Sequence, residues 1–573
     1  MSFPNFITMK LPLPLIFALC AGVATSRAAD KPNILVVLLD DLGYSDLGCY
    51  GGEIPTPNID ALAKGGLRFT HMSNSARCCP TRAALLTGLN PAQAGIPNFN
   101  GQLSTKSATL AEVMRSAGYG TYMVGKWHVG NSAEASPVAR GFDEFYGYTN
   151  GHSSDQWEAG NYKRLPVGHE PEIKYEPGKY YATDAFTDYA LEFIRQAGKK
   201  DKPWLLYLAH SSPHFPIQAP EESSKAFLSI YRRGWDVLRR ERFAKMKSIG
   251  LANSDGWKLT PLSVVPVEKI GNVANGLSGK PNPDWTSLGE DRREDLAHRM
   301  AIYAAMVKHV DDGVGRIVKQ LKEAGSYENT LILLLSDNGA CYEWGPFGFD
   351  GKSREGKTVI HKGPGLEKMG TTHQEMSYGS AWANLCNTPF RLYKHFTHEG
   401  GILTPMIVHW PKGVQQPDRW VRDPANVIDL MPTLVETAGA TYPKERAGET
   451  VPPMEGVSLA PSFRGTTPLP ERAICIQHEG AFAIRKGQWK LVMGKRFPVP
   501  AKWELYDIKA DPVEMNDLAA QKPELVRSLA NEWIAWAKRT GTPGILKADP
   551  DAKVGDVAAP AKPGKRRKSA AAQ

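Results

Sequence analysis

Four continuous apolar segments, each followed at once by polar residues, constrain the fold of this chain most. Residues 34–39 are rich in β-branched side chains and lack polar alternation, which predicts a strand buried on both faces, as in a parallel sheet. Similar strands are predicted at residues 204–208, in "NTLILLLSDNG" and in "GGILTPMIVHWP". A shorter strand is predicted at residues 122–124. Helical patterns lie between them. The alternation predicts an α/β domain with a doubly wound, mostly parallel sheet.

The segments between the strands predict helices and two insertions. Helices are expected at about 58–65, 109–117 and 184–196, and an amphipathic pattern from Val307 to Leu321 predicts another that ends at Gly325. Residues 147–179 and 220–299 are polar or charged and rich in turn-forming residues. We expect these two stretches to be inserted loops, which often shape substrate sites.

The sequence texture changes after about residue 468. Short alternating segments such as "KWELYDI" predict antiparallel strands, and "KPELVRSLANEWIAWAKRTG" predicts one amphipathic helix. We therefore expect a signal peptide at 1–29, a main domain at 30–468, a smaller C-terminal α+β subdomain at 469–545, and a disordered basic tail at 546–573.

The two termini explain the net charge of +9, because they hold seven of the nine excess positive charges. The remaining body is nearly neutral and gives no sign of a nucleic-acid partner. Lys10, an uncharged stretch with two prolines and the small residues before Asp30 are typical of an export signal. The stretch is too short for stable membrane insertion, so we expect a periplasmic or extracellular protein.

Polar clusters follow four of the predicted strands. Asp40-Asp41, "GKWH" at 125–128, "AHSSPH" at 209–214 and "SDNG" at 336–339 stand where the carboxyl ends of parallel strands meet. Adjacent carboxylates repel each other unless a cation lies between them. The all-oxygen set formed by Asp40, Asp41, Asp337 and Asn338 suits Ca²⁺ or Mg²⁺.

Residues 75–88, "SARCCPTRAALLTG", place two cysteines at a predicted helix start. Pro80 suits the first turn and Gly88 the end, so Cys78 lies at the positive end of the helix dipole with Arg82 one turn away. A thiolate nucleophile is one interpretation. The Cys–Arg spacing differs from that of cysteine phosphatases, which argues against a phosphatase-type nucleophile. A disulfide between the two adjacent cysteines would be strained. A zinc site would need further ligands, and only His71 is close in the sequence.

Cys78, Pro80, Arg82, Leu86, Thr87 and Gly88 together resemble the type I sulfatase signature C-x-P-x-R-x-x-x-L-T-G at every fixed position. "NILVVLLDDLG", "GKWHVG", "SSPHFP", "LSDNG" and "HEGG" after Lys394 follow in that family's order. The resemblance covers most of the chain after residue 30. It implies an alkaline-phosphatase-like fold and hydrolysis of sulfate monoesters.

The resemblance also implies roles for single residues. A formylglycine-generating maturation enzyme would oxidise Cys78 to Cα-formylglycine, whose hydrate attacks sulfur. One Ca²⁺ would be bound by this residue and by Asp40, Asp41, Asp337 and Asn338. The remaining roles would fall to basic residues. Arg82 would hold the diol and the carboxylates, and Lys126 and Lys394 would bind the sulfate. His128 would take a proton from the diol, and His214 would protonate the leaving oxygen.

Several alternatives stay open at this point. A phosphate or phosphonate monoester hydrolase and a non-catalytic sulfate-binding protein fit the same fold. His210 competes with His214, Lys394 could be a surface residue, and Leu89 replaces an arginine that is common in the family. Aryl sulfates and small or oligosaccharide sulfate esters both fit as substrates, and Trp157, Trp344 and Trp382 could stack on a ring or simply pack.

Overall fold

The computed structural model describes residues 1, 31–153, 155–200, 202–266, 271–351, 359–465, 467–495 and 501–550. The expected signal peptide from residue 2 onward, and the basic tail from residue 551 onward, lie outside the described residues. Among the described residues, no helix is both long enough and apolar enough to cross a bilayer.

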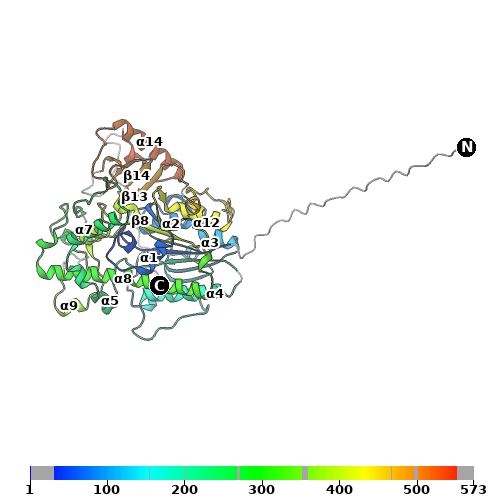
Figure 1. Ribbon diagram of the computed structural model, residues 1–573, viewed down its shortest axis with the longest axis horizontal. Coiled ribbons are helices and arrows are strands. Elements are labelled where there is room, and N and C mark those ends of the chain that lie inside the picture. Colours follow the sequence, from blue (N-terminus) through cyan, green and yellow to red (C-terminus); the bar gives the residue numbers. More distant parts are fainter. Residues whose placement is uncertain are drawn as a thin grey trace, which may run out of the picture.

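One large sheet forms the centre of the molecule (Figure 1). Its ten described strands are β1 (Asn33–Leu39), β2 (Leu67–Ser73), β3 (Gly120–Lys126), β4 (Glu144–Tyr148), β5 (Lys163–Leu165), β6 (Trp204–Ala209), β7 (Thr330–Ser336), β8 (Leu403–His409), β9 (Arg419–Val421) and β10 (Ala425–Asn426). The order is β10-β2-β8-β7-β1-β6-β3-β4-β5, with β9 paired to β2. β1 is parallel to β6 and β7, whereas β8 is antiparallel to β7 and β2. The predicted mostly parallel sheet is confirmed.

Helices cover both faces of this sheet (Figure 1). The odd-numbered residues 35, 37 and 39 of β1 pack into one core with α1 (Pro57–Lys64), α4 (Ala182–Ala197) and α8 (Glu290–Glu323). The even-numbered residues pack into the other core with α2 (Cys78–Thr87), α3 (Leu110–Ser116) and α12 (Leu430–Ala438). This alternation follows from the two-residue period of a strand, and it makes the fold doubly wound, as predicted.

The expected insertion at 220–299 is partly helical. It contains α5 (Glu221–Lys225), α6 (Leu228–Tyr231), α7 (Trp235–Ser248) and the first turns of α8. The sequence did not predict these helices, because their many charged residues are typical of a surface loop. Some of those charged residues are in fact buried as ion pairs. Arg242 of α7, for example, is buried against Asp46 and Glu53.

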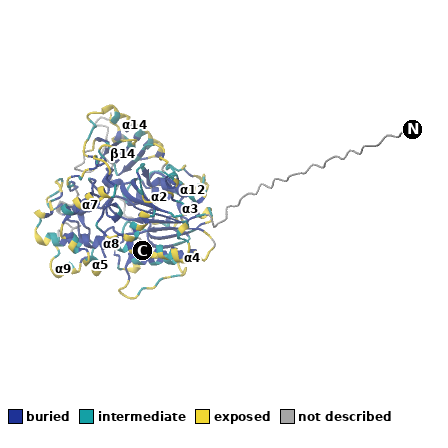
Figure 2. Ribbon diagram, in the orientation of Figure 1, coloured by how far each residue is buried: buried dark blue, intermediate teal, exposed yellow. Residues whose placement is uncertain are grey.

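The remaining short elements lie between β7 and the C-terminal part. They are α9 (Pro364–Glu367), α10 (Gly379–Cys386), α11 (Glu399–Ile402), β11 (Glu445–Arg446), β12 (Glu449–Thr450) and α13 (Ala460–Arg464). Figure 2 shows that α2 and the central strands are buried, whereas exposed residues gather on peripheral helices such as α5 and α9.

The C-terminal part forms a second, antiparallel sheet from β13 (Ile474–His478), β14 (Ala481–Lys486), β15 (Trp489–Met493) and β16 (Trp503–Asp507). One face packs on α14 (Pro523–Thr540) and the short α15 (Ile545–Ala548), as the sequence predicted for one main covering helix. The other face packs on Ala76 and Ile402 of the main domain. The second sheet therefore lies directly against the start of α2.

Candidate functional site

Polar side chains at the carboxyl ends of β1, β3, β6 and β7 converge on the first turn of α2. Because neighbouring parallel strands end at the same edge, residues far apart in the chain come together there. The residues expected for the site are all buried: Asp40, Asp41, Cys78, Arg82, Lys126, His128, His214, Asp337, Asn338 and Lys394.

Cys78 is the first residue of α2, and Gly88 ends the helix in the left-handed conformation, as predicted. Every residue of α2 is buried. All six described cysteines are free, so Cys78 and Cys79 form no disulfide. A hydrogen bond from Cys79 and the charges of Lys126 and His128 hold the pKa of the Cys78 thiol well below its ordinary value, although burial acts in the opposite direction.

Arg82 joins α2 to the ends of two strands. Its Nε and Nη2 donate to Asp337 Oδ2 at 3.0 and 2.7 Å, and its Nη1 donates to the Lys126 carbonyl at 2.9 Å. Nη2 also lies 3.6 Å from Asp40 Oδ2. Charge-assisted bonds from one planar guanidinium fix the relative positions of β3, β7 and the α2 helix.

Two lysines pair with the adjacent carboxylates. Lys126 Nζ contacts Asp40, and Lys394 Nζ lies 2.9 Å from Asp41. Burial raises the pKa of Asp40, and burial together with Asp40 raises the pKa of Asp337. Burial acts upward on Asp41 as well, but Lys394 and His214 outweigh it and lower its pKa.

The residues present fit a hard divalent cation. Asp40 Oδ1 and Asn338 Oδ1 are buried and have no hydrogen-bond partner among the described residues. Asn338 Nδ2 donates to Asp41 Oδ1 at 2.6 Å, which turns the amide oxygen toward the remaining space. Ligand atoms of Asp40, Asp41 and His214 lie within 4.8 Å of one another. Carboxylate and amide oxygens are the donors that Ca²⁺ and Mg²⁺ prefer.

The two expected proton-transfer residues differ in their contacts. His214 Nδ1 lies 2.5 Å from the Phe215 carbonyl, and Nε2 lies 3.4 Å from Asp41 Oδ2. Because a carbonyl only accepts, Nδ1 carries the hydrogen and Nε2 faces the carboxylates. His128 has a φ of 54°, an uncommon conformation for a non-glycine residue that is typical of functional sites. The competitor His210 instead lies against Phe186, with ring centroids 6.1 Å apart.

Sequence reasoning missed a polar cluster beside Cys78. Arg77 Nη1 lies 2.9 Å from His395 Nδ1, and His395 Nε2 lies 2.7 Å from Glu343 Oε1. Arg77 also lies 3.8 Å from Glu479 and 3.8 Å from the centre of the partly exposed Phe99 ring. The one available signal was adjacency in the chain, since Arg77 precedes Cys78 and His395 follows Lys394.

The three tryptophans considered as stacking residues have different surroundings. Trp382 is fully buried and donates to the Leu296 carbonyl, so it belongs to the core. Trp157 donates to the Gly370 carbonyl and packs on Tyr181. Trp344 packs near Phe215, the residue after His214.

Two family models match this chain. The model described as Sulfatase matches residues 32–440, and the model described as N-sulphoglucosamine sulphohydrolase, C-terminal, matches residues 390–536. An uncharacterized sulfatase of Schizosaccharomyces pombe is 30% identical over 89% of this chain and 94% of its own length. The arylsulfatase of Klebsiella aerogenes is 32% identical over 77% of this chain and 94% of its own length.

A solved structure is similar over nearly the whole chain. The crystal structure of Ps i-CgsB in complex with k-i-k-neocarrahexaose has a TM-score of 0.62 and 26% identity, and the similarity covers 90% of this chain and 94% of that one.

Proposed function

This chain belongs to the sulfatase family and is a hydrolase of sulfuric esters, and from this premise we propose how its buried site performs the reaction. We propose that a maturation enzyme of the host converts Cys78 to Cα-formylglycine. We further propose that this residue and four others bind one Ca²⁺: Asp40, Asp41, Asp337 and Asn338. The hydrated aldehyde would supply the attacking oxygen, and the cation would polarise the sulfate.

The observation that carries this proposal is the position of Cys78 within a balanced set of charges. Three carboxylates, Asp40, Asp41 and Asp337, face three cations, Lys126, Arg82 and Lys394. A divalent cation would leave two positive charges in excess. That excess favours a sulfate ester over a neutral ligand and stabilises negative charge on the sulfate oxygens.

Each basic residue then has a defined part. Arg82 keeps its bonds to Asp337 and fixes the start of α2. Lys126 and Lys394 lie on either side of the paired carboxylates and are placed to donate to sulfate oxygens once a cation shares those carboxylates. His128 accepts a proton from the residue at position 78. His214, once it is protonated at Nε2 as well as Nδ1, would deliver the Nε2 proton to the leaving oxygen.

We propose a sulfated carbohydrate as the substrate. The support is the likeness to a structure solved with neocarrahexaose and the cluster of Arg77, Glu343, His395 and Glu479 beside Cys78. Alternating donors and acceptors in such a cluster suit sugar hydroxyls, whereas an aryl sulfate would leave them unused. Aryl sulfates are convenient test substrates, since a relative is an arylsulfatase.

We also propose that the protein is exported to the periplasm or beyond. The support is the basic, apolar and small-residue pattern of residues 1–29. Sequencing the N-terminus of protein purified from its host would test this, because cleavage near Ala28 or Ala29 is expected and an intact Met1 would contradict export by this route.

Mass spectrometry of the peptide containing Cys78 tests the modification. The formylglycine form is expected to be about 18 Da lighter than the thiol form. Fully active enzyme in which Cys78 is entirely a thiol would contradict the proposal.

Rates with p-nitrophenyl sulfate and p-nitrophenyl phosphate test the reaction class. The sulfate ester should be the better substrate by kcat/KM, and a preference for the phosphate ester would favour the alternative phosphate or phosphonate hydrolase. Activity against sulfated oligosaccharides, compared with the aryl ester, tests the substrate class.

A further inference from the structure

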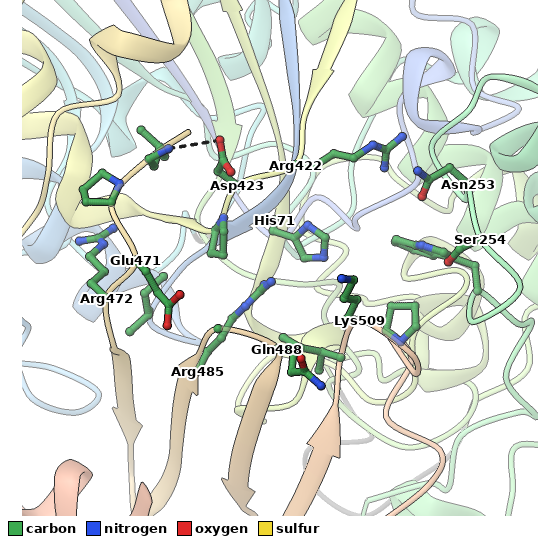
Figure 3. A pocket seen from close by; sticks show the side chains of 18 residues that line it. His71, Asn253, Ser254, Arg422, Asp423, Glu471, Arg472, Arg485, Gln488 and Lys509 are labelled. Atoms are coloured by element: carbon green, nitrogen blue, oxygen red, sulfur yellow. Dashed lines mark hydrogen bonds between the residues drawn. The ribbon is translucent and has the colours of Figure 1, made fainter. Parts of the chain in front are cut away.

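A cavity of about 610 Å³ lies between the main domain and the C-terminal sheet, apart from the sulfatase site (Figure 3). Its wall combines β2, the chain after β9, the loop after α7 and the ends of the C-terminal strands. The residues that carry the argument are His71, Trp257, Arg422, Arg485, Lys509 and Pro512.

The cavity is remote from Cys78. Ile474 at the start of β13 lines the cavity, whereas His478 at the other end of β13 packs on His395 in the cluster beside Cys78. Four residue steps of a strand span about 13 Å. A ligand in the cavity would therefore not touch the sulfatase site.

Arg485 is a charged group without a contacting counter-charge. Its side chain points from β14 into the cavity toward His71 (Figure 3). Its Nε is buried and has no hydrogen-bond partner, and no carboxylate among the described residues forms an ion pair with it. Glu399 influences it from a distance but is bound to Lys490 at 2.5 Å. A half-buried guanidinium whose Nε lacks a partner favours an anionic partner.

The other charged groups leave the cavity positive. Lys509 is exposed and points into the cavity (Figure 3), and Arg422 donates only to the carbonyls of Gly250 and Leu251, at 2.5 and 3.3 Å. Arg472 is paired with Asp429.

Two acids also line the cavity. Asp423 Oδ2 lies 3.4 Å from the backbone nitrogen of Leu469, and Glu471 is exposed. With Arg472 paired, three cationic side chains, those of Arg422, Arg485 and Lys509, thus face two carboxylates. His71 adds no charge at neutral pH, because burial and the neighbouring Arg485 and Arg422 hold its pKa well below the ordinary value.

The remaining wall is apolar and partly flat. Trp257 is buried, and Pro424, Pro512 and Ile508 also belong to the lining. A ring packed on an indole and prolines, with its charged group on a guanidinium, is a common way to bind a small organic acid.

We propose that this cavity is a second, non-catalytic site for a small ring-bearing organic anion. Its sulfate or carboxylate group pairs with Arg485 and Lys509, and its ring lies against Trp257 and Pro512. The inference concerns binding alone and does not depend on the proposed chemistry at Cys78.

Calorimetric titration of full-length Cys78→Ala protein, which cannot turn over substrate, tests the site. Glucuronate and glucose 6-sulfate are the probes, and neutral glucose is the control ligand. We expect saturable binding of at least one anion, weakened about tenfold or more by Arg485→Gln. Arg115→Gln, which removes the same charge from an exposed position on α3, should leave it unchanged. Binding of glucose 6-sulfate would indicate recognition of the sulfate group, and binding of glucuronate would indicate recognition of the carboxylate.

Three further measurements keep the test decisive. If Arg485→Gln fails to fold, Lys509→Gln at the exposed rim replaces it and should weaken binding several-fold. Hydrogen exchange should slow in residues 253–257 and 508–512 when the anion is present. The proposal is overturned if neither anion binds outside the Cys78 site, or if both variants bind like the parent protein. In protein that retains Cys78, kcat/KM of Arg485→Gln for p-nitrophenyl sulfate should equal that of wild type.

Discussion

At the scale of single residues, the site depends on buried charges that neutralise one another. Arg82 is the clearest case, because it holds Asp337 through two bonds and the Lys126 carbonyl through a third. A lysine at this position cannot make the same planar, forked contact.

Arg82→Lys should therefore lower kcat/KM by about 100-fold or more, in line with the loss of one well-oriented charge-assisted interaction in an active site. Arg140→Lys is the matched control, since Arg140 is also buried and donates to Glu112 and Ser107 but lies outside the site. Both variants should lose stability, and only Arg82→Lys should lose activity per folded molecule. Equal kcat/KM in the two variants would contradict the role of Arg82.

His210 should make the fold sensitive to acid. Burial lowers its pKa to about 4 in the folded protein, whereas an unfolded chain has a value near 6.5. Below pH 6.5 the unfolded state binds a proton that the folded state does not, so the stability present above pH 6.5 is lost as the pH falls toward 4. The loss from this residue is about 3 kcal/mol.

Unfolding midpoints measured between pH 7 and pH 4.5 check this expectation. His210→Leu should flatten their dependence on pH, and His169→Leu, at an exposed position, should not. An unchanged slope in His210→Leu would show that other groups govern acid unfolding.

The sequence predicted which residues would lie together at the candidate site better than it predicted their surroundings. Cys78 and Arg82 lie on one helical turn, and the strand-end residues occupy one edge of a parallel sheet, so local pattern and topology bring them together. Arg77, Glu343, His395 and Glu479 meet through loops and a second sheet whose packing no local pattern encodes. For the same reason, the contacts of Lys126 with Asp40 and of Lys394 with Asp41 are not visible in the sequence.

At the scale of elements, α8 shows why helix boundaries were harder to predict than strands. The apolar period indicated a helix from residue 307, but the helix begins at Glu290. Its first half buries Asp295 and Arg299 among Phe349, Ser377 and His361. In the sequence such a charged stretch resembles a surface loop, but in the folded protein these charges are buried as pairs.

Asp295→Asn should destabilise the protein by about 3 to 5 kcal/mol, because it leaves Arg299 buried with a weaker partner. Asp312→Asn removes an exposed ion pair with Lys308 on the same helix and should cost about 1 kcal/mol or less. Urea unfolding of both variants checks the difference. The charges of Arg299 and His361 lower the pKa of Asp295 against burial, so wild type should also lose this contribution as the pH falls below about 4.

At the scale of the whole molecule, two sheets are joined through a shared seam. Its apolar part contains Ala76, Ile402 and Ile476, and its charged part is Lys490, which lies 2.5 Å from Glu399 and 2.7 Å from Glu514. All three charged residues are buried. The two domains should therefore unfold together.

Lys490→Ala would leave two buried carboxylates without their shared cation and should destabilise the protein by about 3 to 5 kcal/mol. Lys486→Ala on the neighbouring strand β14, which removes an exposed pair with Glu532 of α14, should cost about 1 kcal/mol or less. Calorimetry should show one transition for wild type and Lys486→Ala. Two well-separated transitions in wild type would contradict the seam as a common structural unit.

Calcium should stabilise the folded molecule as a whole, because the proposed ligands assemble only on folding. At a free Ca²⁺ concentration about 100 times Kd, the gain is about 2.7 kcal/mol. Thermal unfolding with added Ca²⁺ and with a chelator measures it, and Asp337→Asn should reduce the difference. A melting temperature that Ca²⁺ leaves unchanged in wild type would contradict the proposed site.

The burial of α2 also sets an order of events in time. Cys78 is 2% exposed in the folded protein, and the C-terminal sheet that packs beside it begins at Ile474, about 400 residues later in the chain. A ribosome adds about 5 to 20 residues per second, so synthesis alone leaves Cys78 uncovered by this sheet for about 20 to 80 s. An enzyme that modifies Cys78 has to act within that interval or while the chain is still unfolded. If activity requires the proposed modification of Cys78, the rate of folding thereby limits what fraction of the molecules becomes active.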